Sequence, residues 1–363
     1  MIRVAQLFVE NGYGGIEACI LNYYRHVDRS RVQFDFFVDR EDGILQRSEI
    51  ERLGGRMIVV PPYRKLFSYL FSLKKIFKRE RYDVVHANMN ALSVFPLYAA
   101  KKAGISVRIA HSHSTSSPDE KKKTFVKNLL RPFSKRYATH CFACSRYSGQ
   151  WLFGNADFVL VPNAVDLSHF SFRPQVRQEM RSFLKAEGSF VVGHVGRFVP
   201  QKNHGFLIDV FYEIQRRKPD SVLLLLGDGA DREKTEEKVK ALGLSDRVLF
   251  LGNRQNVADY YCAMDVFLLP SLYEGLPVVG IEAQASGLSC FFADTITLEA
   301  KQTQAVQFLP LEAGSACWAK KILRSPIADR SAQTPFKDGV YDIEVQADRL
   351  TELYEIACTA SKE

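Results

Sequence analysis

Two glutamates with seven residues between them, Glu274 and Glu282, are the side chains of this sequence with the clearest chemical meaning. An apolar run that ends at Pro270 leads into Glu274, and Gly275-Leu276-Pro277 follows it before an amphipathic stretch. Proline suits the first position of a helix, because its missing N–H would have no partner there. We therefore expect Glu274 in the loop before a helix, and Glu282 about a turn and a half inside that helix.

The start of such a helix can hold an anion. Its first backbone N–H groups have no partner within the helix, and they lie at the positive end of the helix dipole. A carboxylate beside a bound phosphate is repelled unless it accepts hydrogen bonds from neutral groups such as sugar hydroxyls. An anion site between two hydroxyl acceptors is what a nucleotide-sugar requires. The alternative is a surface helix with ordinary glutamates in its first turns, which the dipole alone favours.

A second cluster of candidate residues follows the apolar run Phe190–Val195. The segment that begins at Gly196 places Arg197 and Lys202 in a loop at the carboxyl end of an expected strand, and Asn203 can cap the helix after it. A nucleoside diphosphate gains charge as it leaves a sugar, and two fixed cations stabilise that charge without a metal. An Arg/Lys pair in a loop is most often only solvated, so this interpretation depends on the two glutamates.

These segments resemble the E-x7-E and G-R-x-x-x-x-K motifs of the family 4 glycosyltransferases. The resemblance implies that Glu274 contacts the donor sugar and Glu282 the ribose, while Arg197 and Lys202 hold the diphosphate as catalytic cations. It implies that the backbone of Gly275, Leu276, Pro277 and Val278 binds the donor as well. The turns Gly227-Asp-Gly229 and Gly252-Asn-Arg254 follow neighbouring strands and allow close approach of a base. The family receives the nucleotide base in this region, so the resemblance implies that Asn253 and Arg254 bind the donor.

The first half of the chain supplies further residues that match the family. Asn11-Gly-Tyr-Gly-Gly15 looks like its N-terminal glycine loop, in which Gly14 and Gly15 meet the donor phosphate and the acceptor. Ile109-Ala-His-Ser-His-Ser114 presents two histidines on one face, and the family carries a histidine of the active-site cleft here. Strand position favours His113 as the catalytic one, with His111 as the second choice and a structural His111 as the alternative.

Other chemistries fit these residues less well. A dinucleotide fingerprint fails because Glu17 stands where its third glycine belongs, although Asp39 offers a ribose acceptor. Cys141 and Cys144 form a C-x-x-C without a second pair, and the two histidines lack a third ligand, so we expect no metal and no cofactor. A glycoside hydrolase would need its two carboxylates to flank one bond. A degenerate glycosyltransferase that acts as a partner subunit is the non-enzymatic alternative.

Size and charge limit the class of protein. The 363 residues suggest two domains, and no apolar run reaches the ~18 residues of a membrane span. The first nine residues read as a buried strand, not a signal peptide, so we expect a cytoplasmic protein. Up to residue 173 there are 27 Lys/Arg and 15 Asp/Glu, against 22 and 26 afterwards.

The basic residues cluster in two segments, 64–81 and 121–136, where Lys and Arg alternate with aromatic or leucine residues at helical spacing. Such helices suit peripheral contact with an anionic membrane, which would place the protein at the inner face of the membrane. The alternative is an amphipathic helix whose lysines simply face water. No nucleic-acid-binding motif accompanies the charge.

Short apolar runs alternate with amphipathic stretches along the whole chain, which predicts an α/β fold with parallel sheets. We expect strands at 4–9, 34–38, 57–60, 84–87, 107–110, 141–144 and 158–161, and at 190–195, 222–226, 248–251, 266–269 and 290–293. These strands indicate two doubly wound Rossmann-like domains that face each other across a cleft, and the family resemblance implies that this architecture is GT-B-like. The first spans 1–167, with 345–363 crossing back onto it, and the second spans 168–344.

The resemblance covers nearly the whole chain and points to the bacterial capsule and exopolysaccharide subgroup. Gly14-Gly-Ile-Glu-Ala and Gly287-Leu-Ser-Cys-Phe-Phe-Ala-Asp are among the segments that carry it. It implies transfer of a hexose from a nucleotide-diphosphate sugar to a growing glycan, such as a polyprenyl-diphosphate-linked one. Family 4 enzymes retain anomeric configuration, so retention is expected.

Overall fold

The computed structural model describes residues 1–8, 15–39, 47–113, 128–330, 336 and 339–361. The chain forms two compact units, the first of residues 1–165 and 339–363 and the second of residues 166–338. The sequence predicts nearby bounds, with 167 as the end of the first segment and 345 as the return of the chain.

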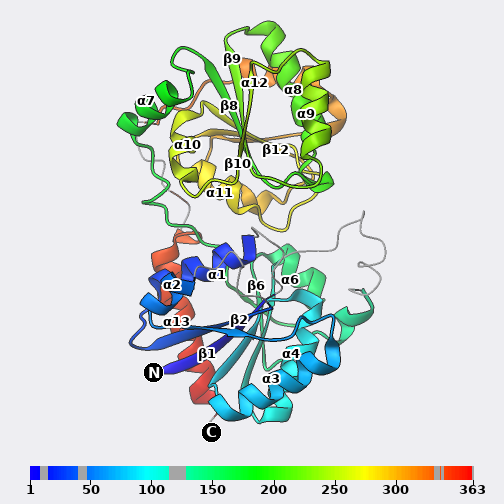
Figure 1. Ribbon diagram of the computed structural model, residues 1–363, viewed down its shortest axis with the longest axis vertical. Coiled ribbons are helices and arrows are strands. Elements are labelled where there is room, and N and C mark those ends of the chain that lie inside the picture. Colours follow the sequence, from blue (N-terminus) through cyan, green and yellow to red (C-terminus); the bar gives the residue numbers. More distant parts are fainter. Residues whose placement is uncertain (9–14, 40–46, 114–127, 331–335, 337–338, 362–363) are drawn as a thin grey trace. The chain divides into compact units, whose positions relative to one another are not determined.

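The first unit is a parallel sheet with helices on both faces (Figure 1). Its strands are β1 (Ile2–Leu7), β2 (Val32–Val38), β3 (Arg56–Val59), β4 (Val84–Ala87), β5 (Val107–Ser112), β6 (His140–Ala143) and β7 (Val159–Leu160). Its helices are α1 (Gly15–His26), α2 (Arg47–Arg52), α3 (Leu66–Glu80), α4 (Val94–Ala103), α6 (Arg146–Phe153) and α13 (Ile343–Ala360), with 3-10 turns η1 (Asn90–Ser93) and η2 (Arg131–Phe133). The strand order is β3-β2-β1-β4-β5-β6-β7.

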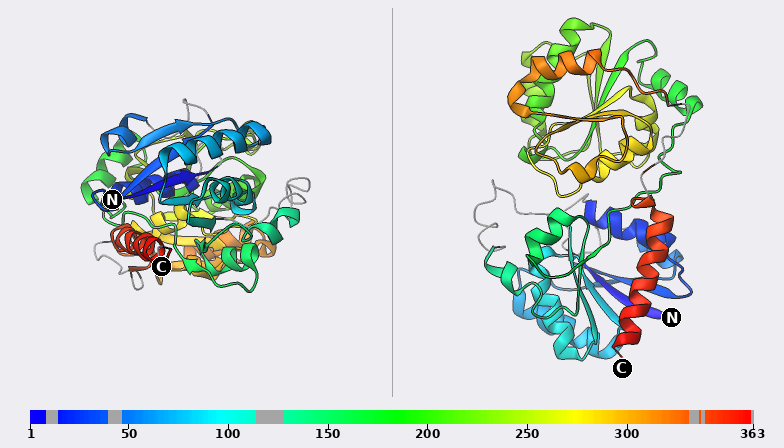
Figure 2. Two further views of the ribbon diagram at one scale, coloured as in Figure 1. Left: turned by 90° about the horizontal axis from the view of Figure 1, so that it is seen from below. Right: turned by 180° about the vertical axis from the view of Figure 1, so that it is seen from behind.

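Successive side chains of a strand point to opposite faces of the sheet, so the hydrophobic core of this unit has one part on each face. Val4 and Phe34 lie in one cluster of buried side chains, and Ala5 and Phe37 lie in the other. The C-terminal helix α13 packs on the first cluster beside α1, as both views in Figure 2 show. It contributes residues at helical spacing: Ile343, Ala347, Leu350, Tyr354 and Ala357.

The second unit repeats the plan. Its strands are β8 (Phe190–Val195), β9 (Ser221–Leu226), β10 (Val248–Gly252), β11 (Val266–Leu269), β12 (Ser289–Ala293) and β13 (Val306–Leu309), all parallel, in the order β10-β9-β8-β11-β12-β13. Its helices are α7 (Pro174–Phe183), α8 (His204–Arg217), α9 (Arg232–Ala241), α10 (Val257–Ala263), α11 (Val278–Ala285) and α12 (Ser315–Arg324). Three 3-10 turns are η3 (Pro200–Lys202), η4 (Leu298–Ala300) and η5 (Leu311–Ala313).

Every strand expected from the sequence is present, with small differences at the ends. The strand β13 is not among the expected ones, because only Val306 of its four residues is buried and Gln307 interrupts its apolar character. Such an edge strand has no continuous hydrophobic run by which it could be recognised.

The strand order creates a switch point in each sheet, where two neighbouring strands are not consecutive in the sequence. These neighbours are β1 and β4 in the first unit, and β8 and β11 in the second. Connections leave such a pair in opposite directions, which opens a crevice at the carboxyl ends of the strands. Among the described helices, none is both long and apolar enough to cross a bilayer.

Candidate active site

The two chemically informative loops of the second unit start at its switch point. One loop follows β8 and carries Arg197 and Lys202, and the other follows β11 and leads to Glu274. The strands pair directly, with Val266 opposite Val192. The loops are also tied to each other, because the Leu272 N–H donates to the carbonyl oxygen of Gln201 at 2.8 Å.

This tie brings Lys202 and Glu274 into contact. The Nζ of Lys202 lies 2.6 Å from Oε1 of Glu274, and their side chains are 14% and 8% exposed. Gln201 donates from Nε2 to the other carboxylate oxygen at 3.1 Å, and to the carbonyl of Tyr273 at 2.9 Å. Gln201 was not predicted from the sequence, where its one available signal is its place directly before Lys202. The Glu274 carboxylate is therefore held in one orientation and keeps lone pairs for a hydroxyl donor.

Arg197 lies in the same loop, with its backbone fixed and its side chain exposed. The loop is anchored on the neighbouring strand end, because Gly196 N donates to Leu226 O at 2.9 Å and Phe198 N to Asp228 O at 3.0 Å. The Arg197 guanidinium has no ion pair with another described residue. A cation with this freedom can reach an anion near the strand ends.

The glycines after β9 serve this anchoring. Gly227 has φ 127°, and a Cβ there would meet the carbonyl oxygen of Gly196 at 2.1 Å. At Gly229, with φ 155°, a Cβ would meet the carbonyl oxygen of Phe198 at 2.5 Å. In the structure these glycines allow close approach of the backbone of the Arg197 loop. The approach of a base, which the sequence predicts, stays a prediction.

Helix α11 begins one residue later than expected. Pro277 occupies the N-cap position with an extended ψ of 101°, and Val278 is the first helical residue. The carbonyl of Pro277 accepts from Gly280 N at 2.9 Å, as the carbonyl of an N-cap residue does. The backbone of Pro277 is extended and not helical, so the helix begins at the next residue. In the described part of the chain, the N–H groups of Val278 and Val279 have no hydrogen-bond partner. Gly275 is half-buried and Leu276 is buried beside them.

Glu282 lies in the second turn of α11, where it meets a residue that the sequence did not single out. Tyr261, fully buried on α10, donates to Oε2 of Glu282 at 3.0 Å. Burial raises the pKa of Glu282 to about 7, and the hydrogen bond from Tyr261 opposes part of that rise. Near neutral pH this carboxyl is poised between its two protonation states, and a hydroxyl donor would favour the charged one.

Asn203 was expected to cap α8 with its side chain, and this prediction was wrong. It does stand at the N-cap position, but with φ 55° and ψ 47°, and its side chain makes no capping hydrogen bond. Asparagine tolerates this left-handed conformation better than most residues. The turn lets the chain pass directly from the 3-10 turn that ends at Lys202 into α8.

The residues assigned to the base, Asn253 and Arg254, are exposed in the turn after β10. The Arg254 Nε donates to the carbonyl of Leu251 at 2.8 Å, within its own turn. Their contact with a base stays a prediction. In the first unit, Gly14 lies outside the described residues, and Gly15 is the first residue of α1.

His113 lies just beyond the carboxyl end of β5 and is 5% exposed. Its Nε2 is 2.8 Å from Oδ1 of Asn88, which follows β4, and its Nδ1 is 3.2 Å from Oδ1 of Asn163, which follows β7. Burial lowers the pKa of His113 to about 4, and the contact with Asn163 acts against that shift. A neutral imidazole between two amides is the result. His111, the second choice, lies within β5 and is 3% exposed.

Comparisons with known proteins add to this geometry. Residues 13–169 match the family model described as Glycosyltransferase Family 4, and residues 175–301 match the model described as Glycosyl transferases group 1. EpsF of Bacillus subtilis (strain 168), which its name describes as a glycosyltransferase, is 33% identical over 98% of this chain and 97% of its own. The chain belongs to the family 4 glycosyltransferases.

Two further comparisons extend the identification. An Escherichia coli enzyme named UDP-Gal:alpha-D-GlcNAc-diphosphoundecaprenol alpha-1,3-galactosyltransferase is 30% identical over 62% of this chain and 61% of its own. Among solved structures, HepE of Anabaena in complex with UDP and glucose has a TM-score of 0.78 at 20% identity and full coverage of both chains. That likeness concerns the fold, and this glycosyltransferase accordingly has the GT-B type of fold with two Rossmann-like domains.

The family assignment decides between two enzyme classes. The protein is a transferase and not a glycoside hydrolase. The contacts of Glu274 and Glu282 with hydroxyls stay a prediction. Cys141 and Cys144 are both free thiols. No group of three metal-ligating side chains occurs among the residues that the structure describes.

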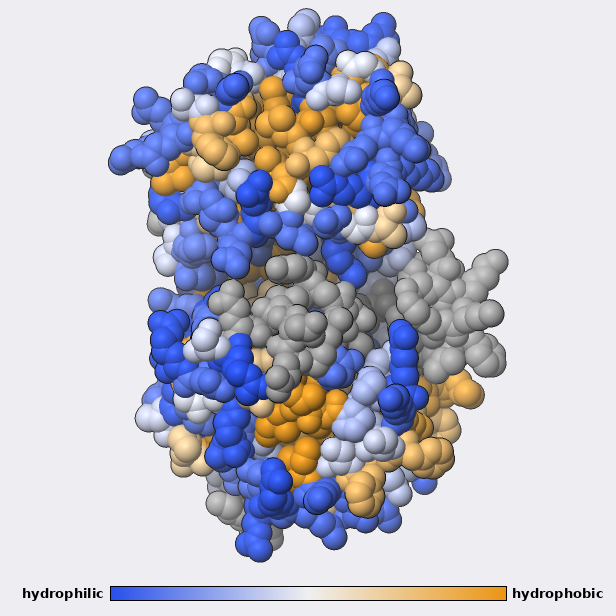
Figure 3. Space-filling model, in the orientation of Figure 1, coloured by the Kyte–Doolittle hydropathy of each residue, from blue (hydrophilic) through white to orange (hydrophobic). Residues whose placement is uncertain are grey.

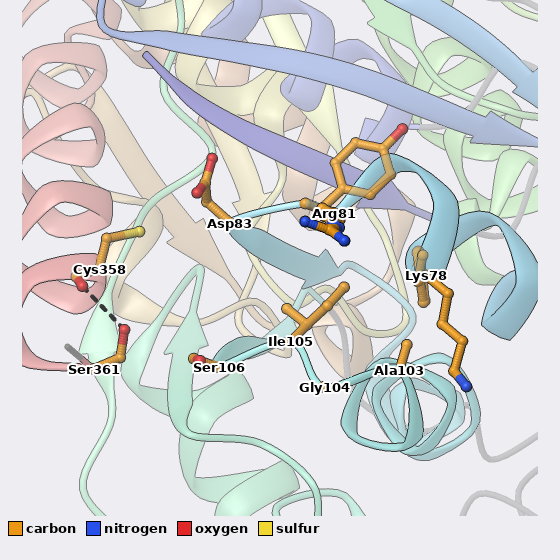
Figure 4. Close-up of a pocket in the computed structure, with 11 residues that line it drawn as sticks. Lys78, Arg81, Asp83, Ala103, Gly104, Ile105, Ser106, Cys358 and Ser361 are labelled. Atoms are coloured by element: carbon orange, nitrogen blue, oxygen red, sulfur yellow. Dashed lines mark hydrogen bonds between the residues drawn. The ribbon is translucent and has the colours of Figure 1, made fainter.

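The first unit contains a cavity of about 390 Å³, whose lining residues Figure 4 shows. Its lining includes Arg81 and Asp83, directly before β4, and Gly104 and Ser106, directly before β5. It therefore opens at the amino ends of the strands, whereas ligands of doubly wound sheets bind at the carboxyl ends. We do not assign the donor to this cavity.

Proposed function

We propose that this glycosyltransferase moves a hexose from a nucleotide-diphosphate sugar to a growing glycan acceptor, with retention of anomeric configuration. The single observation that carries the proposal is the contact between Lys202 and Glu274 at the switch point of the second unit. It joins a cation for a phosphate to an acceptor for a sugar hydroxyl, as a sugar linked to a diphosphate requires.

The diphosphate would be held by side chains and backbone together. An ammonium group has three N–H donors, so Lys202 can keep its bond to Glu274 and still donate to phosphate oxygens. Arg197, exposed and without an ion pair among the described residues, would close on the same anion as a fork of donors. The unpartnered N–H groups of Val278 and Val279 add a helix start. These groups stabilise the charge that develops as the glycosidic bond breaks.

The two glutamates would grip hydroxyls. Glu274, oriented by Gln201, would accept from the transferred sugar, and Glu282 would accept from the ribose. His113 would meet the reacting face of the sugar. Retention would proceed through a short-lived oxocarbenium ion pair. In it the acceptor hydroxyl would attack the face from which the phosphate departs and would give its proton to that phosphate. We propose no protein nucleophile, and no metal or cofactor, since the cations and amides supply the charge stabilisation.

The acceptor would be a lipid-linked precursor of a capsule or exopolysaccharide. The name of the E. coli relative specifies a diphosphoundecaprenol-linked acceptor, which supports this class of substrate. A partner subunit without activity is the alternative, and an assay of sugar transfer by the wild type separates it from an enzyme.

The enzyme would reach such an acceptor through α3. Phe67 and Phe71 on this helix are 91% and 74% exposed, while Tyr69, Leu73 and Phe77 face the core. If Phe67 is position i, then Phe71 is i+4, Lys74 is i+7 and Lys78 is i+11. Residues at this spacing lie on one face of a helix. On the face drawn in Figure 3, apolar side chains lie among hydrophilic ones over the first unit. This pattern supports docking on anionic lipid at the inner face of the membrane.

The second basic segment, 121–136, contributes less support to docking, because residues 121–127 lie outside the described part of the chain. The remainder includes Leu129 and Phe133, which are 60% and 45% exposed. Residues 131–133 form a 3-10 turn, so the segment does not end as the continuous helix that its spacing predicted.

Thermal unfolding with a panel of UDP- and GDP-linked sugars tests the donor, and radiolabel transfer to a polyprenyl-diphosphate-linked sugar tests the reaction. We expect one nucleotide-sugar to stabilise the protein and to be consumed. Glu274→Ala should abolish transfer while the protein stays folded. A wild-type protein that binds donors but transfers no sugar to any acceptor would support the inactive partner subunit instead.

Liposome sedimentation tests the membrane contact. Charge reversal at Lys74, Lys75 and Lys78, all exposed, should release the enzyme from vesicles that contain anionic lipid. The matched control reverses Lys234, Lys320 and Lys321, which are exposed on the second unit. Equal binding of the two triple variants would contradict docking through α3.

A further inference from the structure

A network of buried polar side chains crosses the first unit from the C-terminal helix to His113. Its members lie on β1, β4, β5 and α13 or directly after these strands, and each is at most 5% exposed: Gln6, His86, Asn88, His111, His113 and Tyr354. Such a network is costly unless every member is partnered, so its presence in a hydrophobic core requires an explanation.

One arm of the network ends on a ring nitrogen of His113. Tyr354 Oη accepts from Nε2 of Gln6 at 3.1 Å, and Oε1 of Gln6 accepts from Nδ2 of Asn88 at 2.9 Å. The Oδ1 of Asn88 in turn lies 2.8 Å from Nε2 of His113. The hydroxyl on α13 thus orients two amides in series, and the second amide orients the imidazole.

The other arm ends on the face of the same ring. Tyr354 Oη lies 2.6 Å from Nδ1 of His86, and Nε2 of His86 lies 2.9 Å from Nδ1 of His111. The His111 ring then packs on His113, with centroids 3.9 Å apart and an interplanar angle of 33°. Tyr354 is therefore the common start of two paths, one to a nitrogen of His113 and one to its face.

The order of protons in the network follows from neutral rings, because each neutral imidazole donates once and accepts once. Burial lowers the pKa of His86 to about 3 and that of His113 to about 4. The Tyr354 hydroxyl accepts from Gln6, so it donates to His86, whose Nε2–H donates to His111. On the other arm the amide of Asn88 donates to Gln6, so its oxygen accepts from Nε2–H of His113.

We propose that Tyr354 is a positioning residue for catalysis, which fixes the orientation and the Nε2–H tautomer of His113 through Gln6 and Asn88 and supports its ring through His86 and His111. This inference rests on the proposed function, in which His113 meets the reacting sugar. His113 Nδ1 then carries a lone pair. The Oδ1 of Asn163 lies 3.2 Å from it, so this proton order requires the Asn163 amide to be turned by 180°, which exchanges its oxygen and nitrogen. The C-terminal segment returns to the first unit and thereby becomes part of the active-site support.

The test compares Tyr354→Phe with Tyr24→Phe. Tyr24 is also a fully buried tyrosine of this unit, and its hydroxyl contacts Gln33 Oε1 at 2.6 Å and Leu53 O at 3.0 Å, outside the network. Both variants keep the ring and lose a bonded hydroxyl, so similar losses of stability are expected. Only Tyr354→Phe should lower kcat, by about tenfold, with the KM for the donor nearly unchanged.

A second readout does not depend on turnover. In protein labelled with 15N histidine, two-bond 1H–15N spectra distinguish the tautomers of each ring, and His113→Ala identifies the signals of His113. We expect a pure Nε2–H tautomer in the wild type and in Tyr24→Phe, and a mixture of tautomers in Tyr354→Phe.

The outcomes separate the two hypotheses. If Tyr354→Phe and Tyr24→Phe have the same kcat while His113→Ala is inactive, the proposed function stands and the positioning role is wrong. An Nδ1–H tautomer in the wild type overturns the proton order, and an unchanged tautomer in Tyr354→Phe overturns the support by Tyr354. If the wild type transfers no sugar, the proposed function fails, and the catalytic part of this inference fails with it.

Discussion

At the scale of single residues, the pair of Lys202 and Glu274 has a structural role beside the catalytic role that we propose for it. Each side chain keeps the other from being buried without a partner, since they are 14% and 8% exposed. Loss of one partner therefore costs stability as well as activity, and a variant of either residue alone cannot separate the two effects.

We expect Lys202→Met to lower kcat by about 10² and to destabilise the second unit by about 2 kcal/mol. The double variant Lys202→Met/Glu274→Gln should recover the stability, because the neutral amide no longer needs a cation, but not the activity. Urea unfolding and transfer kinetics on the same preparations measure both. Near-normal transfer by Lys202→Met would contradict its role at the phosphate.

Glu282 predicts a pH dependence of stability. Its folded pKa of about 7 lies above the ordinary value of 4.5, so the stability linked to this group is fully present below pH 4.5 and is lost as pH rises through 7. Glu282→Gln cannot ionise and should remove that loss. At pH 8 the variant should exceed the wild type by about 3 kcal/mol in unfolding free energy, with little difference at pH 4.5. Parallel stability curves for the two proteins would contradict the raised pKa.

At the scale of elements, the site depends on the contact between the turn after β9 and the loop after β8. Gly227 permits that contact, because a Cβ there would overlap the Gly196 carbonyl at 2.1 Å. The loop carries Arg197, so an alteration of the turn should affect the proposed phosphate site without any change in the side chains of that site.

Gly227→Ala should therefore weaken nucleotide-sugar binding by about tenfold and destabilise the second unit by about 2 kcal/mol. The matched control is Gly243→Ala. Gly243 has φ 68°, and a Cβ added there would have nothing within 4 Å, so this variant incurs only the backbone strain. Isothermal titration with the nucleotide-sugar compares them, and equal affinities would show that the turn does not position the loop.

At the scale of the whole molecule, α13 belongs to the first unit although 173 residues of the second unit precede its segment. Leu350 on this helix is 3% exposed within the core of the first unit, whereas Ile356 on the same helix is 66% exposed. The chain carries two tryptophans, and each unit contains one, Trp151 in the first and Trp318 in the second.

Leu350→Ala should destabilise the first unit by about 3 kcal/mol, while Ile356→Ala should have almost no effect. Tryptophan fluorescence during urea unfolding can follow one unit at a time. In a Trp318→Phe background the signal comes from Trp151 and reports the first unit, and in a Trp151→Phe background it comes from Trp318 and reports the second. We expect a lower midpoint for the Trp151 signal alone. A shift of the Trp318 signal alone would mean that α13 supports the second unit.

The sequence was sufficient to predict the strands that are buried on both faces. β4, β8 and β11 were predicted with their observed ends, because continuous apolar runs between polar turns have few other structures available. The half-buried edge strand β13 lacks that pattern and was missed. Motif spacing likewise selected Lys202 and Glu274, because loops after neighbouring parallel strands meet at one edge of a sheet.

Other features depended on contacts between residues far apart in the sequence. Gln201 orients Glu274 across 73 positions, Tyr261 holds Glu282 from another helix, and Tyr354 reaches His86 across 268 positions. Local patterns fix which residues are helical, extended or buried, but partners of this kind are chosen only when sheets and helices pack. The sequence by itself therefore determined the family, the two sheets and the residue types of the candidate site. The tertiary structure decided which side chains hold those residues in place.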